Sequence, residues 1–219
     1  MTTRPPAPDH NNPNGFSGQD AGPVREIPPL MIALGGLSGS GKTTLAYLLA
    51  RHLPHTVVLD SDVLRKRMHG QDPLTPLPDA VYTPMHTARF IDYARGIAME
   101  HMSQGKNVIV TGLFIDPQSR AGQKAAAEST GGKFVGLYLD MPPAKLFKRV
   151  ADRSQNPSDA RVDTLRRQIH SKPSQPSTRE GWHILRADKG LDRTLNLALD
   201  IIRHHGTSVP STPKPWKPF

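Results

Sequence analysis

Apolar residues along the chain gather in short runs that alternate with stretches of helical periodicity. Residues 30–34 form an uninterrupted apolar run, typical of a buried strand. After a glycine-rich segment, four leucines from Leu45 to Leu53 recur at helical spacing until Pro54 ends the pattern. The same alternation continues to residue 204, so strands and helices are predicted in turn along most of the chain.

This pattern predicts five strands and seven helices. The strands are expected at residues 30–34, 56–59, 107–110, 134–139 and 182–185. The helices are expected at residues 45–53, 62–68, 88–102, 117–129, 143–153, 159–171 and 191–204. Ser61 is the expected N-cap of the second helix. Because strands alternate with helices, we expect a parallel sheet covered on both faces, with ligands at the carboxyl-terminal edge of the strands.

The two ends of the chain lack this pattern. Residues 1–28 are rich in proline, asparagine, glycine and aspartate and have almost no large apolar side chains, so a disordered tail is expected. Residues 206–219 contain four prolines and are expected to form a second loose tail, which includes Trp216 and Phe219. A single domain over residues 29–205 is therefore predicted between the tails.

The glycine-rich segment after the first strand carries the clearest chemistry. Residues 36–43 read Gly-Leu-Ser-Gly-Ser-Gly-Lys-Thr and fit the pattern G-x-x-x-x-G-K-[ST], between a predicted strand and a predicted helix. In such a loop, backbone N–H groups wrap around phosphates at a helix N-terminus, the lysine reaches the β- and γ-phosphates, and the next hydroxyl holds Mg²⁺. The sequence therefore predicts an α/β fold of the P-loop NTPase type, with three layers and a five-stranded, mostly parallel sheet. The predicted nucleotide-binding residues are Gly36, Leu37, Ser38, Gly39, Ser40, Gly41, Lys42, Thr43 and Thr44, with Thr43 also a Mg²⁺ ligand.

The chain carries a formal net charge of +9. Such a surplus is typical of nucleic-acid partners or of a phosphate-handling enzyme with a basic lid. Basic residues cluster within residues 65–67, 145–149 and 166–167. No aromatic side chains interleave with them as in a stacking platform, so nucleic acid is the less favoured substrate or partner.

Cysteine usage and hydropathy bear on the compartment. The chain has no cysteine, which excludes disulfides and thiolate metal sites and suits a reducing environment. No apolar stretch approaches the roughly 20 residues of a membrane span, and the N-terminus lacks the apolar core of a secretory signal. We therefore expect a cytoplasmic protein without a membrane partner.

The second predicted strand delivers Asp60, Ser61 and Asp62 to the same sheet edge as the glycine loop. Phosphoryl transfer to a hydroxyl needs a carboxylate that accepts or orients the acceptor proton. Asp62 is expected to face the loop, and Arg65, one helical turn later, to hold an anionic group of the acceptor. Asp60 is a candidate partner of Mg²⁺ through water. The alternative is that Asp60 or Asp62 only caps the helix and that Arg65 is a solvated surface charge.

Residues beyond the loop carry a more specific resemblance. The glycine loop followed by residues 57–68 resembles a family of P-loop kinases (AAA_33-like) that is related to zeta toxins, chloramphenicol phosphotransferase and polynucleotide kinase domains. Residues 82–84 with Thr87 and Arg89 are similar to the family's segment after the substrate loop. Residues 156–160 are similar to its lid, as are Leu165 and Gln168.

The resemblance covers about residues 30–188 and implies a small helical lid at about residues 149–171. It implies that a γ-phosphoryl group passes from ATP to an acceptor hydroxyl, with Lys42 on the phosphates. Asp62 matches the family's candidate base, and Arg65 matches its substrate-side arginine. Arg149 and Arg153 match arginines that close over the triphosphate, and their i, i+4 spacing lets both point from one helix face. A solvated basic face is the alternative for these two.

The third strand departs from the family pattern. Relatives often end it with an acidic residue, whereas this chain has Thr111 after Val110. Mg²⁺ would then rely on Thr43, the phosphates, water and Asp60, or on Asp116 reaching in.

Two functions stay open at this point. The first is a Mg²⁺-dependent kinase that uses ATP and acts on a small-molecule or nucleotide-type acceptor, and the basic charge favours a 5′-hydroxyl polynucleotide kinase as one form of it. The second is a nucleotide-binding module in which a triphosphate orders a partner-binding surface without transfer. Asp62, Arg65 and the lid arginines favour the kinase, whereas Thr111 favours the module. The acceptor, the choice between ATP and GTP, and the oligomeric state do not follow from the sequence.

Overall fold

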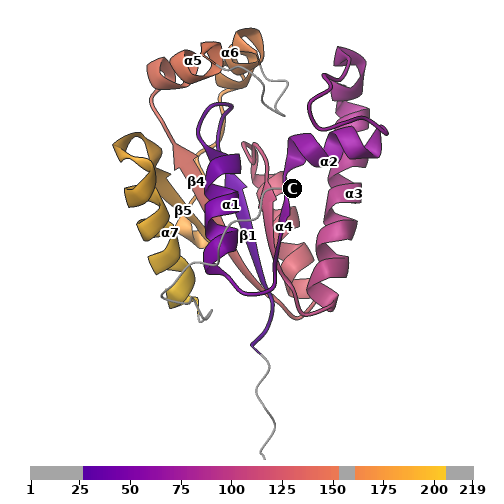
Figure 1. Cartoon of the computed structure of the whole chain (residues 1–219), viewed down its shortest axis with the longest axis vertical. Helices are drawn as coiled ribbons and strands as arrows, with labels where there is room; N and C mark the ends of the chain where they lie inside the picture. Colours follow the sequence, from indigo (N-terminus) through magenta and orange to yellow (C-terminus); the bar gives the residue numbers. More distant parts are fainter. Residues whose placement is uncertain (1–26, 153–160, 206–219) are drawn as a thin grey trace, which may run out of the picture.

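Five parallel strands form one sheet in the order β2-β3-β1-β4-β5 (Figure 1). The computed structural model describes residues 27–152 and 161–205. The strands are β1 (Leu30–Gly35), β2 (Thr56–Leu59), β3 (Asn107–Thr111), β4 (Lys133–Asp140) and β5 (Trp182–Arg186). In the register of the central strand, Ile32 lies between Ile109 of β3 and Val135 of β4. The predicted α/β three-layer fold is confirmed, with all neighbouring strands parallel.

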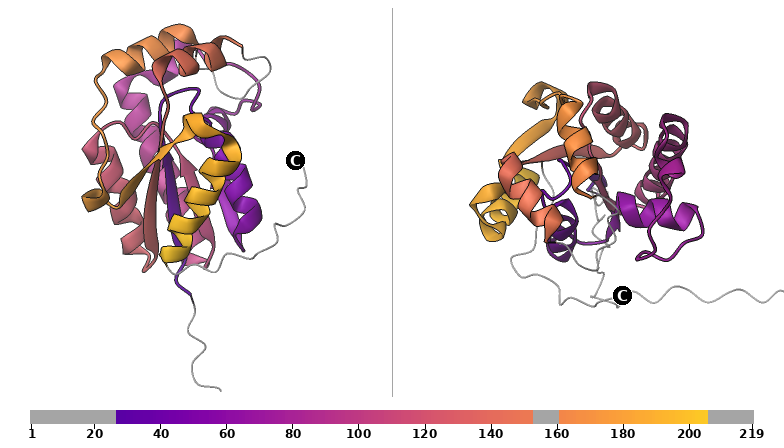
Figure 2. Two further views of the ribbon diagram at one scale, coloured as in Figure 1. Left: turned by 90° about the vertical axis from the view of Figure 1, so that its left-hand side faces the viewer. Right: turned by 90° about the horizontal axis from the view of Figure 1, so that it is seen from above.

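Seven α-helices occur within the described residues. They are α1 (Lys42–His52), α2 (Ser61–Met68), α3 (Pro84–Ser103), α4 (Pro117–Ser129), α5 (Pro143–Ala151), α6 (Val162–His170) and α7 (Leu191–His204). Three 3-10 turns join them, namely η1 (Asp79–Tyr82), η2 (Thr178–Glu180) and η3 (Ala187–Lys189). Helices α5 and α6 lie above the carboxyl-terminal ends of the strands, away from the layers that cover the sheet (Figure 2). The lid expected at about residues 149–171 would include the end of α5 and all of α6, and both helices are called the lid helices below.

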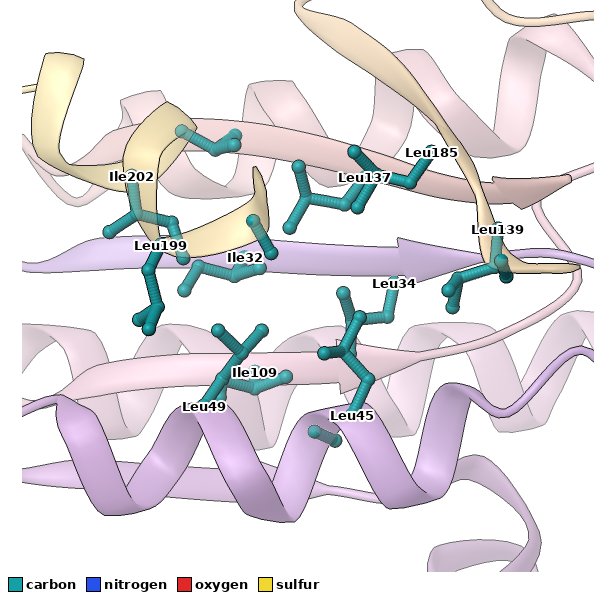
Figure 3. Packing of buried hydrophobic residues seen from close by; sticks show 14 of the residues in the cluster. Ile32, Leu34, Leu45, Leu49, Ile109, Leu137, Leu139, Leu185, Leu199 and Ile202 are labelled. Atoms are coloured by element: carbon teal, nitrogen blue, oxygen red, sulfur yellow. The ribbon is translucent and has the colours of Figure 1, made fainter. Parts of the chain in front are cut away.

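The central strand divides the core into two halves by the alternation of its side chains. Ile32 and Leu34 belong to the cluster that packs under α1 and α7, with Leu45 and Leu199 among the facing residues (Figure 3). Met31 lies on the opposite face, in a cluster with residues of α3 and α4. All residues of β1 are buried because helices cover both faces, which explains the continuous apolar run in the sequence.

A buried tryptophan fixes the spacing between β4 and β5. Trp182 is fully buried and lies 5.3 Å from Phe114 and 6.0 Å from Phe134, measured between ring centroids. Its ring lies on Gly136, where a Cβ atom would come within 2.2 Å of the indole. Glycine is required there because a side chain would occupy the volume of the ring. The contact helps to position β5 beside β4. The segment that connects α6 to β5 ends at this tryptophan.

The starts of two helices differ from the prediction because a capping residue determines where each helix begins. Asp60, rather than Ser61, is the N-cap of α2, since its side chain accepts hydrogen bonds from the Asp62 and Val63 N–H groups. Helix α3 begins four residues before the apolar stripe at Ala88, because Thr83 caps it and Pro84 suits its first turn. The predicted helices at residues 143–153 and 159–171 are observed as α5 and α6, each shorter than expected.

Some predictions fall outside the described residues. These are Arg153, residues 156–160 of the family resemblance, and nearly all of the expected tails, residues 1–26 and 206–219. Between residues 27–152 and 161–205, no helix has the length and apolar character that a bilayer span requires.

Candidate active site

The glycine loop connects β1 to α1 through three glycines with positive φ. Gly36, Gly39 and Gly41 have φ values of 140°, 91° and 99°. At Gly36 a Cβ atom would lie 2.7 Å from the Ser40 hydroxyl oxygen and 2.8 Å from the Leu139 carbonyl oxygen, so the tight turn excludes any side chain. The loop ends at the N-terminus of α1, where free N–H groups and the helix dipole favour an anion. The geometry fits the phosphate loop that the sequence predicts.

Lys42 binds the first two residues of this loop, Gly36 and Leu37. Its Nζ atom donates to the carbonyl oxygens of Gly36, at 2.8 Å, and of Leu37, at 3.0 Å. The ammonium group therefore lies against the phosphate loop, the position from which a lysine meets phosphate oxygens.

Thr43 and Asp60 come together from different elements. The Thr43 hydroxyl donates to Asp60 Oδ2 over 2.7 Å, although the residues belong to α1 and to the end of β2. Asp60 is only 4% exposed, and its Oδ1 atom accepts the two N–H groups at the start of α2. Asp60 thus caps the helix and also contacts Thr43, the predicted Mg²⁺ ligand.

Arg65 is buried in an aromatic setting on the other side of the site. Its guanidinium carbon lies 4.1 Å from the ring centroid of Phe90 and 5.1 Å from that of Tyr82. It also donates to the carbonyl oxygen of Val81 over 3.3 Å. Burial lowers the pKa of Arg65, while Tyr82 and the Asp62 carboxylate act in the opposite direction. The alternative that Arg65 is a solvated surface charge is wrong, since the residue is 8% exposed.

Asp62 lies in the first turn of α2, half-buried. Its charge acts on Arg65, which follows it by one helical turn. Both residues lie on α2, which begins at the carboxyl-terminal end of β2, and Arg65 contacts the segment before α3.

Thr111 lies at the end of β3, where the family resemblance implies an acidic residue. It is 3% exposed, and its hydroxyl accepts a hydrogen bond from the Ser61 N–H over 3.0 Å. The hydroxyl thereby ties the start of α2 to the end of β3. Asp116, the proposed substitute, is exposed and caps α4 by accepting from the Ser119 N–H over 2.7 Å.

The lid meets the loop through two side chains. Arg149 of α5 donates to the Gly39 carbonyl oxygen over 3.4 Å. Gln168 of α6 accepts from the Ser38 N–H and donates to the Ser38 hydroxyl, each over 3.0 Å. Gln168 was not among the predicted site residues, because a glutamine on an amphipathic helix carries no chemical signature of its own.

A pocket of about 310 Å³ adjoins residues 39–41 of the loop. The loop, Leu45, Leu139 and Arg149 form part of its wall, and residues after β5 complete it, namely Ala187, Leu191 and Thr194. These three were also missed, since only the pairing of β5 with β4 brings them to the loop. A hollow of about 480 Å³ lies elsewhere, beside Lys133 and His205, and none of its lining residues belongs to the loop or the lid.

Comparison with known proteins agrees with this geometry. A family model described as an AAA domain (AAA_33) matches residues 31–173. A search of curated protein sequences found no match.

Solved structures of similar fold are kinases in several cases. A sugar kinase from Janibacter sp. HTCC2649 matches with a TM-score of 0.61 and 18% identity, over 80% of this chain and 95% of that chain. The APS kinase CysC of Mycobacterium tuberculosis, in complex with AMPPNP and APS, matches with a TM-score of 0.59 and 19% identity, over 81% and 99%. A chain of the Pnkp1/Rnl/Hen1 RNA repair complex matches with a TM-score of 0.54 and 18% identity, over 68% and 45%. At these identities the likeness concerns the fold. From the family match and the phosphate loop together, the chain belongs to the AAA_33 family and has the fold of a P-loop kinase.

Proposed function

We propose that this protein is a kinase that transfers the γ-phosphoryl group of ATP to a hydroxyl group of a small-molecule or nucleotide-type acceptor. The observation that carries the proposal is the meeting of three parts at one sheet edge. These are the phosphate loop with Lys42, the Thr43–Asp60 contact, and the Asp62–Arg65 pair at the start of α2.

The donor side of the site suits a nucleoside triphosphate. The loop N–H groups and Lys42 provide positive ends for the β- and γ-phosphates. Arg149 approaches the same loop from the lid, where it can offset the charge that develops on the travelling phosphoryl group. The adjoining pocket of about 310 Å³ offers apolar walls, Leu139 and Leu191 among them, for the nucleoside.

The residues beside the loop fit a magnesium ion. The Thr43 hydroxyl and the buried Asp60 carboxylate are hard oxygen donors, 2.7 Å apart. No cluster of three carboxylate or imidazole side chains suited to a metal is found in residues 27–152 and 161–205. Thr43 and Asp60 would therefore share the ion with phosphate oxygens and water, and when bound it neutralises charge on the β- and γ-phosphates.

Transfer would proceed by in-line displacement. The acceptor oxygen forms a bond to the γ-phosphorus while the bond from that phosphorus to the bridging oxygen breaks, and ADP leaves. Asp62 accepts the acceptor proton, and Arg65 holds an anionic or polar group of the acceptor so that its hydroxyl points at the phosphorus.

The direct test follows label from γ-³²P-ATP and Mg²⁺ into nucleotide sugars, aminoglycosides, chloramphenicol, sugars and 5′-hydroxyl oligonucleotides. In Asp62→Asn we expect transfer to fall by about 10²- to 10⁴-fold while ATP affinity stays within about twofold, because only the proton acceptor is lost. Asp200→Asn, which changes an exposed carboxylate on α7, is the matched control. Full turnover by Asp62→Asn would assign the base to another group.

One observation favours a second function. With Thr111 tied to the Ser61 N–H, the third strand contributes no carboxylate to the metal, which suits a module that binds a nucleotide without transferring its phosphate. Tight ATP binding with no labelled product from any acceptor in the panel would favour this module.

A further inference from the structure

Lid helix α6 contacts the phosphate loop through one carboxamide. Gln168 Oε1 accepts the Ser38 N–H and Gln168 Nε2 donates to the Ser38 hydroxyl, both over 3.0 Å. One side chain therefore engages the backbone and the side chain of the same loop residue. Two simultaneous bonds fix the orientation of the carboxamide as well as its distance, which a single bond would not do.

Core packing holds α6 in position to make this contact. Leu165, three residues before Gln168, is fully buried in the same cluster as Leu146 and Val150 of α5. Leu37 of the loop packs against that cluster. A helix of nine residues has little stability by itself, so α6 depends on these contacts for its place.

Residues 36–38 of the loop are thus held by hydrogen bonds from two helices, α1 and α6. Lys42 binds the carbonyl oxygens of Gly36 and Leu37 from α1, and Gln168 binds Ser38 from α6. The next residue, Gly39, accepts from Arg149 of α5. The two lid helices are therefore anchored on neighbouring loop residues, α6 on Ser38 and α5 on Gly39.

We propose that Gln168 is a positioning residue that docks the lid on the phosphate loop and thereby holds Arg149 over Gly39. The inference rests on the proposed kinase function, because a docked lid matters for turnover only if the loop binds a triphosphate. Coupling of this kind is reciprocal, so a nucleotide that orders the loop also stabilises the docked lid.

The first measurement is hydrogen–deuterium exchange of the nucleotide-free protein. In Gln168→Ala the amides of α6 should exchange about tenfold faster than in the parent, since two hydrogen bonds are lost, while those of α7 stay unchanged. Gln168→Asn keeps the carboxamide but shortens its stem, so it should behave like Gln168→Ala. Gln168→Glu retains two acceptor oxygens for the Ser38 N–H and hydroxyl, so it should restore slow exchange.

The second measurement separates positioning from a purely structural effect. For ATP turnover we expect KM to rise about tenfold in Gln168→Ala and Gln168→Asn with little change in melting temperature. Gln168→Glu should also raise KM, although its lid is docked, because its charge opposes that of the triphosphate. His170→Gln, an exposed position on the same helix, should match the parent protein in both measurements.

A mutant cycle with Ser38→Ala tests the contact itself. Ser38→Ala keeps the backbone bond and should raise exchange about threefold, and adding it to Gln168→Ala should change nothing further. Unchanged α6 exchange in Gln168→Ala would overturn the inference. If the parent protein binds no nucleotide, the proposed function fails, whereas the exchange result still decides whether Gln168 docks the lid.

Discussion

The donor and acceptor sides of the site are built in different ways. The donor side consists of backbone groups in one tight loop whose glycines admit no alternative residue, as at Gly36. The proposed acceptor side consists of side chains from α2, η1 and α3, namely Arg65, Tyr82 and Phe90. A binding site formed by backbone groups requires glycines at fixed positions and can therefore be recognised in the sequence. A binding site formed by side chains can change its residues while the fold stays the same. This difference explains why the triphosphate can be inferred while the acceptor stays unnamed.

The largest expected effect is a loss of ATP affinity on the donor side. Lys42→Ala removes the ammonium group that lies against the loop, so ATP affinity should fall about 100-fold or more in calorimetry. Lys124→Ala, which changes a partly exposed lysine on α4, should bind ATP like the parent protein. Equal ATP affinity in Lys42→Ala would contradict the assignment of the loop.

A smaller effect should break the acceptor side and spare the donor side. Arg65→Gln removes the guanidinium between Phe90 and Tyr82, so KM for the acceptor should rise about tenfold while ATP affinity is unchanged. Loss of the cation–π contacts should also lower the free energy of unfolding by about 1 kcal/mol. Arg67→Gln, exposed on the same helix, is the control for both measurements. A change in ATP affinity in Arg65→Gln would show that the two sides are not independent.

The smallest expected effect is a change in the pH dependence of stability at Glu180. Glu180 binds Arg120, which is 1% exposed and also donates to the carbonyl oxygen of Ser174, in the segment that returns from the lid. Burial alone would raise the pKa of Glu180, but hydrogen bonds from Arg120 and Ser177 outweigh it and lower the pKa below 4.5. A lowered folded-state pKa stabilises the fold above the unfolded-state value, and this stabilisation is lost as pH falls through the folded-state pKa.

Glu180→Gln should therefore reduce the free energy of unfolding by about 0.5 kcal/mol at pH 7, and by less below pH of about 4. Urea unfolding at both pH values measures this difference. Equal destabilisation at both would mean that packing, and not charge, joins these residues.

Much of the fold follows from the sequence, because local patterns specify it. The run at residues 30–34 is apolar throughout since β1 is covered on both faces, and the phosphate loop has a fixed motif. The prediction of Ser61 as the N-cap of α2 was wrong, because both residue types suit the position and Asp60 is the residue that caps the helix. Only the contact with Thr43, brought in from α1, shows why the aspartate occupies it.

The burial of Arg65, a predicted site residue, and the positions of the missed site residues depend on long-range packing. Arg65 is buried because α3 carries Phe90 to it, and no pattern within α2 announces that. Leu191 and Thr194 reach the pocket only because β5 pairs with β4. Gln168 and Ser38 lie 130 residues apart, so their contact depends on the folded lid.

The place of β1 in the middle of the sheet also determines the order of assembly during synthesis. Its partners are residues 108–111 of β3 and 133–138 of β4, so the strand leaves the ribosome long before either neighbour exists. At translation rates of about 5–20 residues per second, this apolar segment waits several seconds without a partner. The strand that supports the phosphate loop is therefore the part of the nascent chain most in need of protection from aggregation.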